Sequence, residues 1–207
     1  MSKWMLPTLL VLALVPASVM AKSNKLMQPA AEQKAPAVEA GKAMVVVMRP
    51  SYYGGAIAAS IYDVTNGDIR FIGVLGPKDK IAYQSEPGNR RFMVVAENAD
   101  FMETTLEAGE TYYAVVRARP GVWKARFSLI PIKAESKDQY NLQDPEFKGW
   151  EAASEWVEST PRATAWFDEN RPSVEEKYKT YLVKWDAMLP IDKAELTMGP
   201  EDGVASP

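Results

Sequence analysis

The sequence contains neither cysteine nor histidine among its 207 residues. The first absence excludes a disulfide framework, a cysteine nucleophile and c-type haem attachment. The second excludes a Ser-His-Asp triad, and the two absences together exclude a structural zinc site. Any catalysis would therefore rest on carboxylate, lysine or hydroxyl groups alone.

Motifs for phosphate, dinucleotide or nucleophilic chemistry are missing as well. The chain has no Gly-x-Ser-x-Gly elbow, no Ser-x-x-Lys pair, no glycine-rich phosphate loop and no Gly-x-Gly-x-x-Gly fingerprint. Residues 63–68 have oxygen ligands at the spacing of a calcium loop, but Val74 stands where such a loop has a bidentate glutamate. A hairpin turn explains that segment better. We expect no enzymatic activity, no catalytic residue, no cofactor and no metal ion.

The N-terminal residues have the pattern of an export signal. Lys3 supplies a positive charge, residues 9–15 form a short apolar core, and small side chains precede Lys22 at the cleavage positions. The core is too short to span about 30 Å of hydrocarbon. We therefore expect cleavage after Ala21, a periplasmic or secreted protein, and no integral membrane segment after cleavage. Export and a formal net charge of −3 argue against a nucleic-acid partner.

Composition divides the chain into four parts, of which residues 1–21 are the signal peptide. Residues 22–42 are rich in Ala, Pro, Lys and Gln, which predicts a flexible arm. Residues 43–134 carry a net charge of +2 and many Val, Ile, Tyr and Phe residues, which predicts a β-sandwich domain. Residues 135–207 carry a net charge of −8 and a helical composition, which predicts an acidic helical extension.

The middle part contains about eight short segments of strand composition, separated by turn signals every 8–12 residues. The Asn-Gly pair at 66–67 is the strongest hairpin signal, because both positions of a type I′ turn need a positive φ. Pairing across this turn sets Asp63 opposite Arg70. It also sets Tyr62 opposite Phe71. The predicted fold is mainly β: an antiparallel sandwich of about eight strands, with the helical extension packed on it.

The acidic part has helix start signals at 144–145 and 160–161 and a capping box at 173–176, whose helix ends at Pro190. Aromatic side chains recur at helical spacing. Four tryptophans lie in this part: Trp150, Trp156, Trp166 and Trp185. They could form a membrane-surface or glycan-binding face, but the polar face is acidic and anionic headgroups would repel it. We expect them to pack in a core.

A basic face on the last hairpin is the one candidate binding patch. A two-residue loop at 120–121 pairs Ala118 with Trp123 and Ala114 with Phe127, which predicts that these side chains face the core. The opposite face then carries four basic residues, Arg117, Arg119, Lys124 and Arg126. Like charges across a ladder are destabilising. We expect them to face the chain's own acidic helices, an external anionic ligand, or solvent.

Three short segments carry a resemblance to a known family. They are residues 44–50 (MVVVMRP), 86–88 (EPG) and 107–113 (EAGETYY). Over roughly 43–132 the chain resembles a bacterial family of small exported β-sandwich domains of unknown function, found in proteins predicted to be lipoproteins. It departs from those members in having no lipidated cysteine. The resemblance implies a fold and supplies no catalytic residues, because the family has no established activity.

These observations predict an exported, non-catalytic binding or scaffolding module of the bacterial envelope, with an envelope protein or an anionic ligand as its partner. The alternative is a carboxylate-dependent hydrolase acting on envelope glycans, because 27 Asp and Glu residues always offer pairs. A close, half-buried carboxylate pair in a cleft would favour the hydrolase. A convex sandwich without pockets would favour the module.

Overall fold

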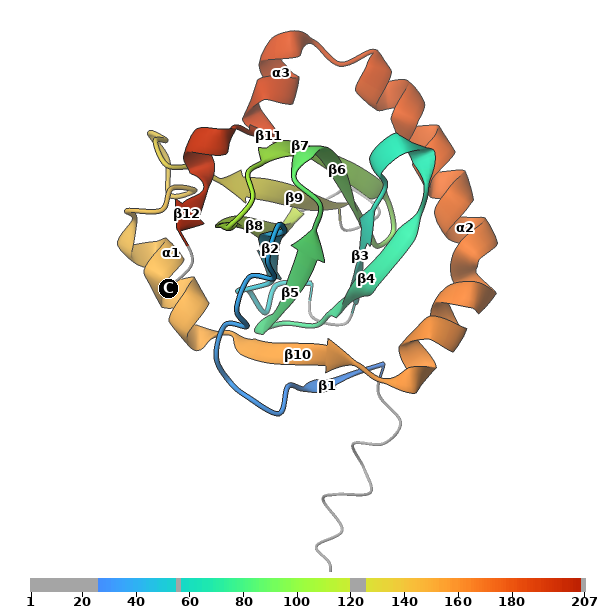
Figure 1. Ribbon diagram of the computed structural model, residues 1–207. Coiled ribbons are helices and arrows are strands. Elements are labelled where there is room, and N and C mark those ends of the chain that lie inside the picture. Colours follow the sequence, from blue (N-terminus) through green and yellow to red (C-terminus); the bar gives the residue numbers. More distant parts are fainter. Residues whose placement is uncertain (1–25, 55–56, 120–125, 206–207) are drawn as a thin grey trace, which may run out of the picture.

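The computed structural model describes residues 26–54, 57–119 and 126–205, which form two sheets with helices around them (Figure 1). The prediction of a mainly β fold with a helical C-terminal part is confirmed. Within the described residues, no helix combines the length and apolar character needed to cross a membrane.

The larger sheet has seven strands, in the order β1-β10-β5-β2-β8-β12, with β9 also paired to β8. Its strands are β1 (Met27–Pro29), β2 (Ala43–Met48), β5 (Asp79–Ser85), β8 (Glu110–Arg119), β9 (Arg126–Ile132), β10 (Glu155–Ser159) and β12 (Val204–Ala205). The smaller sheet has five strands, in the order β11-β7-β6-β3-β4. They are β3 (Ala59–Asp63), β4 (Arg70–Leu75), β6 (Gly88–Val95), β7 (Ala99–Leu106) and β11 (Thr197–Met198).

Strand β2 shows how the layers are built. All six of its residues are buried. Val45 and Val47 face the core between the sheets, whereas Met44, Val46 and Met48 belong to a second apolar cluster outside the larger sheet. A strand covered on both faces needs no polar alternation, which explains its unbroken aliphatic sequence.

The helices cover the outer faces of the sheets and lie on opposite sides of the molecule in Figure 1. Helix α1 (Pro145–Ala153) places Phe147 in the cluster outside the larger sheet. Helix α2 (Pro161–Asp186) buries Phe167, Val174 and Trp185 against the smaller sheet. The chain also contains α3 (Pro190–Glu195) and the 3-10 turns η2 (Thr65–Gly67) and η3 (Pro200–Asp202).

The expectation of eight antiparallel strands is wrong in two respects. The described residues form strands β1 to β12, and three pairs are parallel: β2 with β8, β10 with β5, and β11 with β7. Local turn signals report only pairs that are adjacent in sequence. The parallel partners are far apart in the chain, and β1, β11 and β12 have only two or three residues each, too few to show an alternating pattern.

Segments expected outside the sandwich contribute strands to it. Met27–Pro29 lies in the predicted flexible arm, yet it pairs with β10 as strand β1, which corrects the expectation for these residues. The acidic extension supplies β10 and β12 to the larger sheet and β11 to the smaller one. The C-terminal part therefore contributes strands to both sheets, in addition to the helices that pack on them.

Helix α2 also corrects a predicted boundary. A capping box at 173–176 predicted a new helix, whereas α2 runs without a break from Pro161 through Pro172. Phe167 and Val174 lie on either side of Pro172 and are buried in the same cluster on the smaller sheet. This shared burial favours one continuous helix despite the backbone hydrogen bond that a proline removes.

The first hairpin agrees with its sequence. Asn66 has φ 58° and Gly67 has φ 85°, and Tyr62 lies opposite Phe71. Asp63 lies opposite Arg70, as predicted. The rings of Tyr62 and Phe71 are 5.7 Å apart between centroids.

Candidate functional site

The β8–β9 hairpin has a different register from the predicted one. Phe127 lies opposite Ala118 rather than Ala114, and Arg117 lies opposite Ser128. The two-residue loop at 120–121 is therefore wrong, because β8 ends at Arg119 and β9 begins at Arg126. The slip is an even number of residues, so each described side chain of β8 and β9 keeps its predicted face. The prediction that Phe127 is a core residue is confirmed.

Of the four predicted basic residues, Arg117, Arg119 and Arg126 lie in the described part of the hairpin, and all three are exposed. Arg119 lies 3.4 Å from a carboxylate oxygen of Asp100 on β7, and it also contacts the hydroxyl of Ser128. Arg126 is exposed opposite Arg119 on the neighbouring strand. Lys124, like Trp123, lies outside the described residues. Arg117 borders a cavity.

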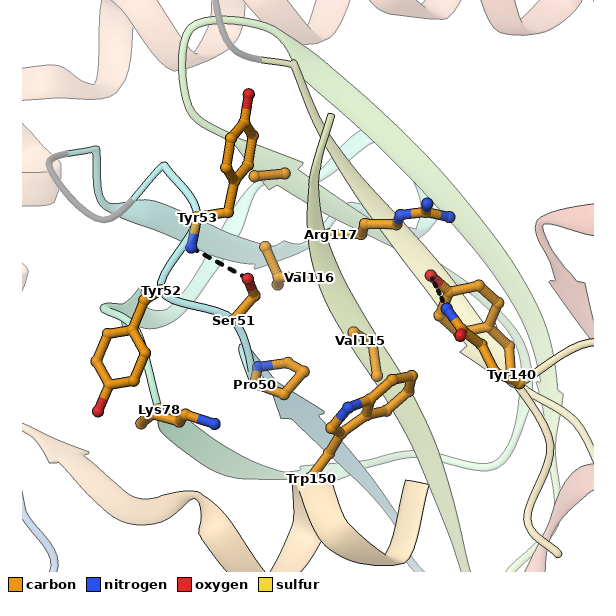
Figure 2. Close-up of a pocket in the computed structure, with 12 residues that line it drawn as sticks. Pro50, Ser51, Tyr52, Tyr53, Lys78, Val115, Val116, Arg117, Tyr140 and Trp150 are labelled. Carbon is orange, nitrogen blue, oxygen red and sulfur yellow. Dashed lines mark hydrogen bonds between the residues drawn. The ribbon is translucent and has the colours of Figure 1, made fainter. Parts of the chain in front are cut away.

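This cavity, which we call the tyrosine cleft, has a volume of about 610 Å³ and is open to solvent. Its lining comes from residues 50–53 after β2, Lys78 in the turn before β5, residues 115–118 of β8, residues 139–140, and Trp150 of α1. Figure 2 shows β8 running through the middle of the cleft, with the 50–53 loop on one side and Tyr140 on the other. Segments from four parts of the chain therefore converge on one strand.

Aromatic rings and cations alternate around the tyrosine cleft. The side chains of Tyr52 and Tyr53 are 73% and 55% exposed, although each is a large ring. The Lys78 ammonium lies 5.4 Å from the centre of the Tyr52 ring. The Arg117 guanidinium lies 5.6 Å from the centre of the Tyr140 ring. Each wall thus presents an aromatic face paired with a positive charge.

The second wall is extended by Trp150. Its ring centre lies 5.8 Å from that of Tyr140, with the planes tilted by 39°. Both rings are half-buried and pack on the apolar cluster outside the larger sheet. This support fixes their orientation toward the cleft.

Arg49 holds the loop that carries the exposed tyrosines. It is 1% exposed, and its guanidinium donates hydrogen bonds to the carbonyls of Gly54 at 2.7 Å and Ile57 at 2.6 Å. It also donates to the Leu75 carbonyl at 3.0 Å and lies 4.9 Å from the centre of the Phe127 ring. Burial lowers the pKa of Arg49, but an arginine in a protein stays charged. These hydrogen bonds therefore hold the loop that carries Tyr52 and Tyr53 from its buried side.

Gly54 allows this loop to approach the sheet closely. Its φ is +69°, and a Cβ placed there would come within 3.1 Å of Phe127 and 3.3 Å of Ala118. A side chain would have to displace the core at that point, and the positive φ would add strain. The loop can therefore lie on the end of β8 while Tyr52 and Tyr53 remain exposed.

Lys78 has an unusual backbone conformation for a lysine. Its φ of 67° is in the left-handed region, where a non-glycine residue is strained. Two backbone hydrogen bonds of 2.7 Å impose it: the Lys78 N–H donates to the Arg49 carbonyl, and the Glu155 N–H donates to the Lys78 carbonyl. Such strain persists where the surroundings impose it, and it is frequent at functional sites. Here it accompanies a side chain that reaches over Tyr52.

Acidic side chains are scarce in the described linings of two cavities. The described lining of the tyrosine cleft includes no Asp or Glu. A second cavity of about 430 Å³, between α2 and the smaller sheet, has Glu97 as the one acidic residue of its described lining. No group of three or more His, Cys, Asp or Glu side chains that could hold a metal ion lies in the described parts of the chain. Neither cavity therefore offers the close carboxylate pair of a glycoside hydrolase.

Sequence reasoning missed most of this site. Tyr52, Tyr53, Lys78 and Tyr140 were not singled out, and Trp150 was assigned to a helical core stripe. A usable signal was present, because two tyrosines stand directly between Arg49-Pro50 and a pair of glycines. Large rings beside such a turn are hard to bury.

Comparisons with known proteins do not identify the chain. No protein-family model matches it, and no curated protein sequence matches it. One similar solved structure is the NMR structure of a protein from Eubacterium rectale, which is 10% identical with a TM-score of 0.33. The match covers 47% of this chain and 94% of that one. A likeness this weak bears on neither fold nor function, and the family resemblance drawn from the sequence stays a prediction.

Proposed function

We propose that the chain is an exported, non-catalytic binding module of the bacterial envelope whose ligand occupies the tyrosine cleft. The observation that supports this most is the pair of exposed rings, Tyr52 and Tyr53, held in place by a buried arginine beside a cavity of ligand size. Tyrosine is suited to such a role, because its ring gives apolar contact and its hydroxyl stays hydrated.

Preorganisation supports the same conclusion. Ordering a loop when a ligand binds costs affinity. Here the hydrogen bonds from Arg49 to Gly54 and Ile57 fix the tyrosine loop in the unbound protein. The opposite wall rests on a packed cluster through Trp150. A ligand would meet two walls that are already in place.

The charge of the cleft favours an anionic ligand. Lys78 and Arg117 line it from opposite sides, and no carboxylate is among its described lining residues. Partners with complementary potential associate faster and are selected over like-charged ones. The chain as a whole is acidic, so this local positive charge is a feature of the cleft. We do not propose the hydrolase alternative, because no observation favours it.

Export rests on residues 1–21, which lie outside the described residues. Mass spectrometry of the protein recovered from a bacterial periplasm should find Lys22 as the first residue. Recovery of the chain with Met1 still attached would contradict the export part of the proposal, and it would leave the cleft unaffected.

An NMR titration of the mature protein tests the binding part. The probes are a set of acidic hexapeptides and an acidic oligosaccharide, polygalacturonate fragments. We expect at least one probe to shift the amide signals of residues 50–53, 115–118 and 139–140. The double variant Tyr52→Ala/Tyr53→Ala should lose these shifts, whereas Val183→Ala, an exposed residue on α2, should keep them. If no probe perturbs the cleft, or the double variant responds like the wild type, the proposal is wrong.

A further inference from the structure

Strand β8 extends beyond the strand that flanks it. Its parallel pairing with β2 ends where Met48 lies opposite Val115. On its other edge, β8 stays paired with β9 as far as Arg119 opposite Arg126. Among the described residues, 116–119 therefore have a strand partner on one edge only.

The unpaired edge of residues 116–119 opens into the tyrosine cleft. Val116 and Ala118 pack with the core between the sheets, yet both also border the cleft. Residues 50–54 continue the chain where β2 ends, but among the described residues no backbone hydrogen bond joins them to 116–119. In Figure 2 this stretch of β8 lies between the two walls of the cleft, with Val116 and Arg117 on opposite sides of the strand.

Such an edge is a template for another strand. Successive residues of a strand turn their N–H and C=O groups to opposite edges, so every second residue of 116–119 presents both groups to the cleft. Extended peptides bind proteins by pairing with groups of this kind, while their alternate side chains enter neighbouring pockets. The two aromatic walls would contact those side chains.

We infer that the ligand of the tyrosine cleft is an extended, acidic peptide segment that adds to β8 as a strand, in the place that β2 leaves beyond Met48. This inference rests on the proposed function and specifies its ligand class. Arg117 supports the acidic character, because a carboxylate opposite an exposed arginine on a strand is a favourable cross-strand pair. Lys78 adds a second positive charge on the other wall.

An acidic oligosaccharide shares part of this chemistry, because it could contact the tyrosines and the two cations. It could not form a ladder with β8. The length of the free edge also suits a peptide, because about four residues of β8 are available for pairing. A peptide ligand can therefore be distinguished from a sugar, because only the peptide forms backbone hydrogen bonds with β8.

The experiment uses the mature protein and a library of blocked hexapeptides that alternate acidic and β-branched residues. The tightest member is then synthesised with N-methyl groups on one alternate set of its residues, and separately on the other set. We expect one set to weaken binding about tenfold or more, because its N-methyl groups remove the backbone hydrogen bonds to β8. The other set points away from β8 and should bind nearly as well as the parent peptide.

Hydrogen exchange gives a second readout on the protein. The parent peptide should slow exchange at alternate amides of residues 116–119, and polygalacturonate should leave their exchange unchanged. Arg117→Glu should weaken binding of the acidic peptide. It should strengthen binding of a peptide in which lysine replaces the acidic residues. Lys179→Glu, the same charge change at an exposed position on α2, should do neither.

The outcomes separate this inference from the proposed function. If no peptide binds at millimolar concentration while polygalacturonate shifts the cleft signals, strand addition is wrong and the binding function stands. Equal binding of both N-methylated peptides and the parent would also overturn strand addition. If neither kind of probe perturbs the cleft, both proposals fail.

Discussion

Two aromatic surfaces lie on the same pair of sheets, and they differ in what covers them. On the smaller sheet, Tyr62 and Phe101 are fully buried under α2. The helix adds its own rings, with Trp185 1% exposed and 5.8 Å from Phe101 between centroids. At the tyrosine cleft, no described segment of the chain covers Tyr52.

This difference separates aromatic residues that stabilise the fold from those free to bind. Rings under α2 leave water when the chain folds, and each buried ring contributes about 1.5–3 kcal/mol. An exposed ring contributes little to folding, so Tyr52 and Tyr53 should add little to the stability of the fold. The ligand that we propose for the tyrosine cleft would cover them.

Charged groups follow the same division. Under α2, Asp100 is 2% exposed, accepts a hydrogen bond from the Tyr181 hydroxyl and lies beside Arg119. Burial raises the pKa of Asp100 and also that of Tyr181. This network joins α2 to β7 and β8. In the tyrosine cleft, by contrast, Lys78 and Arg117 lie against aromatic faces at the surface.

The largest expected effect is at Trp185. Trp185→Ala removes a fully buried ring from the α2 surface and should lower the free energy of unfolding by about 3–5 kcal/mol. Urea unfolding followed by circular dichroism measures it. Val183→Ala on the same helix is the control, because Val183 is 71% exposed, and it should change the free energy by less than about 0.5 kcal/mol. Similar values for the two variants would mean that α2 does not pack as described.

The next effect concerns the support of the tyrosine cleft. Arg49→Met keeps the volume but leaves the carbonyls of Gly54, Ile57 and Leu75 without their donor. We expect a loss of roughly 2–4 kcal/mol in the free energy of unfolding and faster hydrogen exchange at residues 51–54. Lys179→Met removes an exposed charge and should do neither. If exchange at 51–54 is unchanged in Arg49→Met, Arg49 does not position the loop.

A smaller effect is the pH dependence that Asp100 gives the α2 surface. Because burial raises its pKa in the folded state, the folded protein binds this proton more tightly than the unfolded chain. Stability should therefore fall as the pH rises from about 4, the unfolded value, through the raised pKa. In Asp100→Asn this contribution to the stability profile should be absent.

Tyr181→Phe sharpens the same test. The hydrogen bond from Tyr181 lowers the pKa of Asp100 and so partly offsets burial. Its removal should move the fall in stability to higher pH. Unfolding free energies measured in steps of pH provide both profiles, and profiles of wild type and Asp100→Asn that run parallel would exclude this role for Asp100.

Features that depend on residues close together in the sequence could be predicted from the sequence. The turn at Asn66, the N-cap at Asp144 and the burial of Phe127 were predicted, because each follows from local conformation or from alternation along one strand. Alternation fixes which face a side chain takes but leaves even slips of register open. The slip of Phe127 from Ala114 to Ala118 is of that kind.

The tyrosine cleft could not be predicted, because it depends on contacts between distant segments. It exists because β2 ends at Met48 while β8 continues, and because Trp150 and Lys78 come to it from other parts of the chain. Arg49 appeared in the sequence only as part of the segment 44–50 that carries the family resemblance. Its role as the support of the loop requires the carbonyls of Ile57 and Leu75, whose positions the sequence does not specify.

The most direct test of the contrast between the two surfaces is the free energy of unfolding of the double variant Tyr52→Ala/Tyr53→Ala. We predict a value within about 1 kcal/mol of the wild type, because both rings are exposed and the contact between Lys78 and Tyr52 is a surface one. A loss of several kcal/mol, comparable to that of Trp185→Ala, would show that these tyrosines hold the fold together and would contradict their assignment to a binding site.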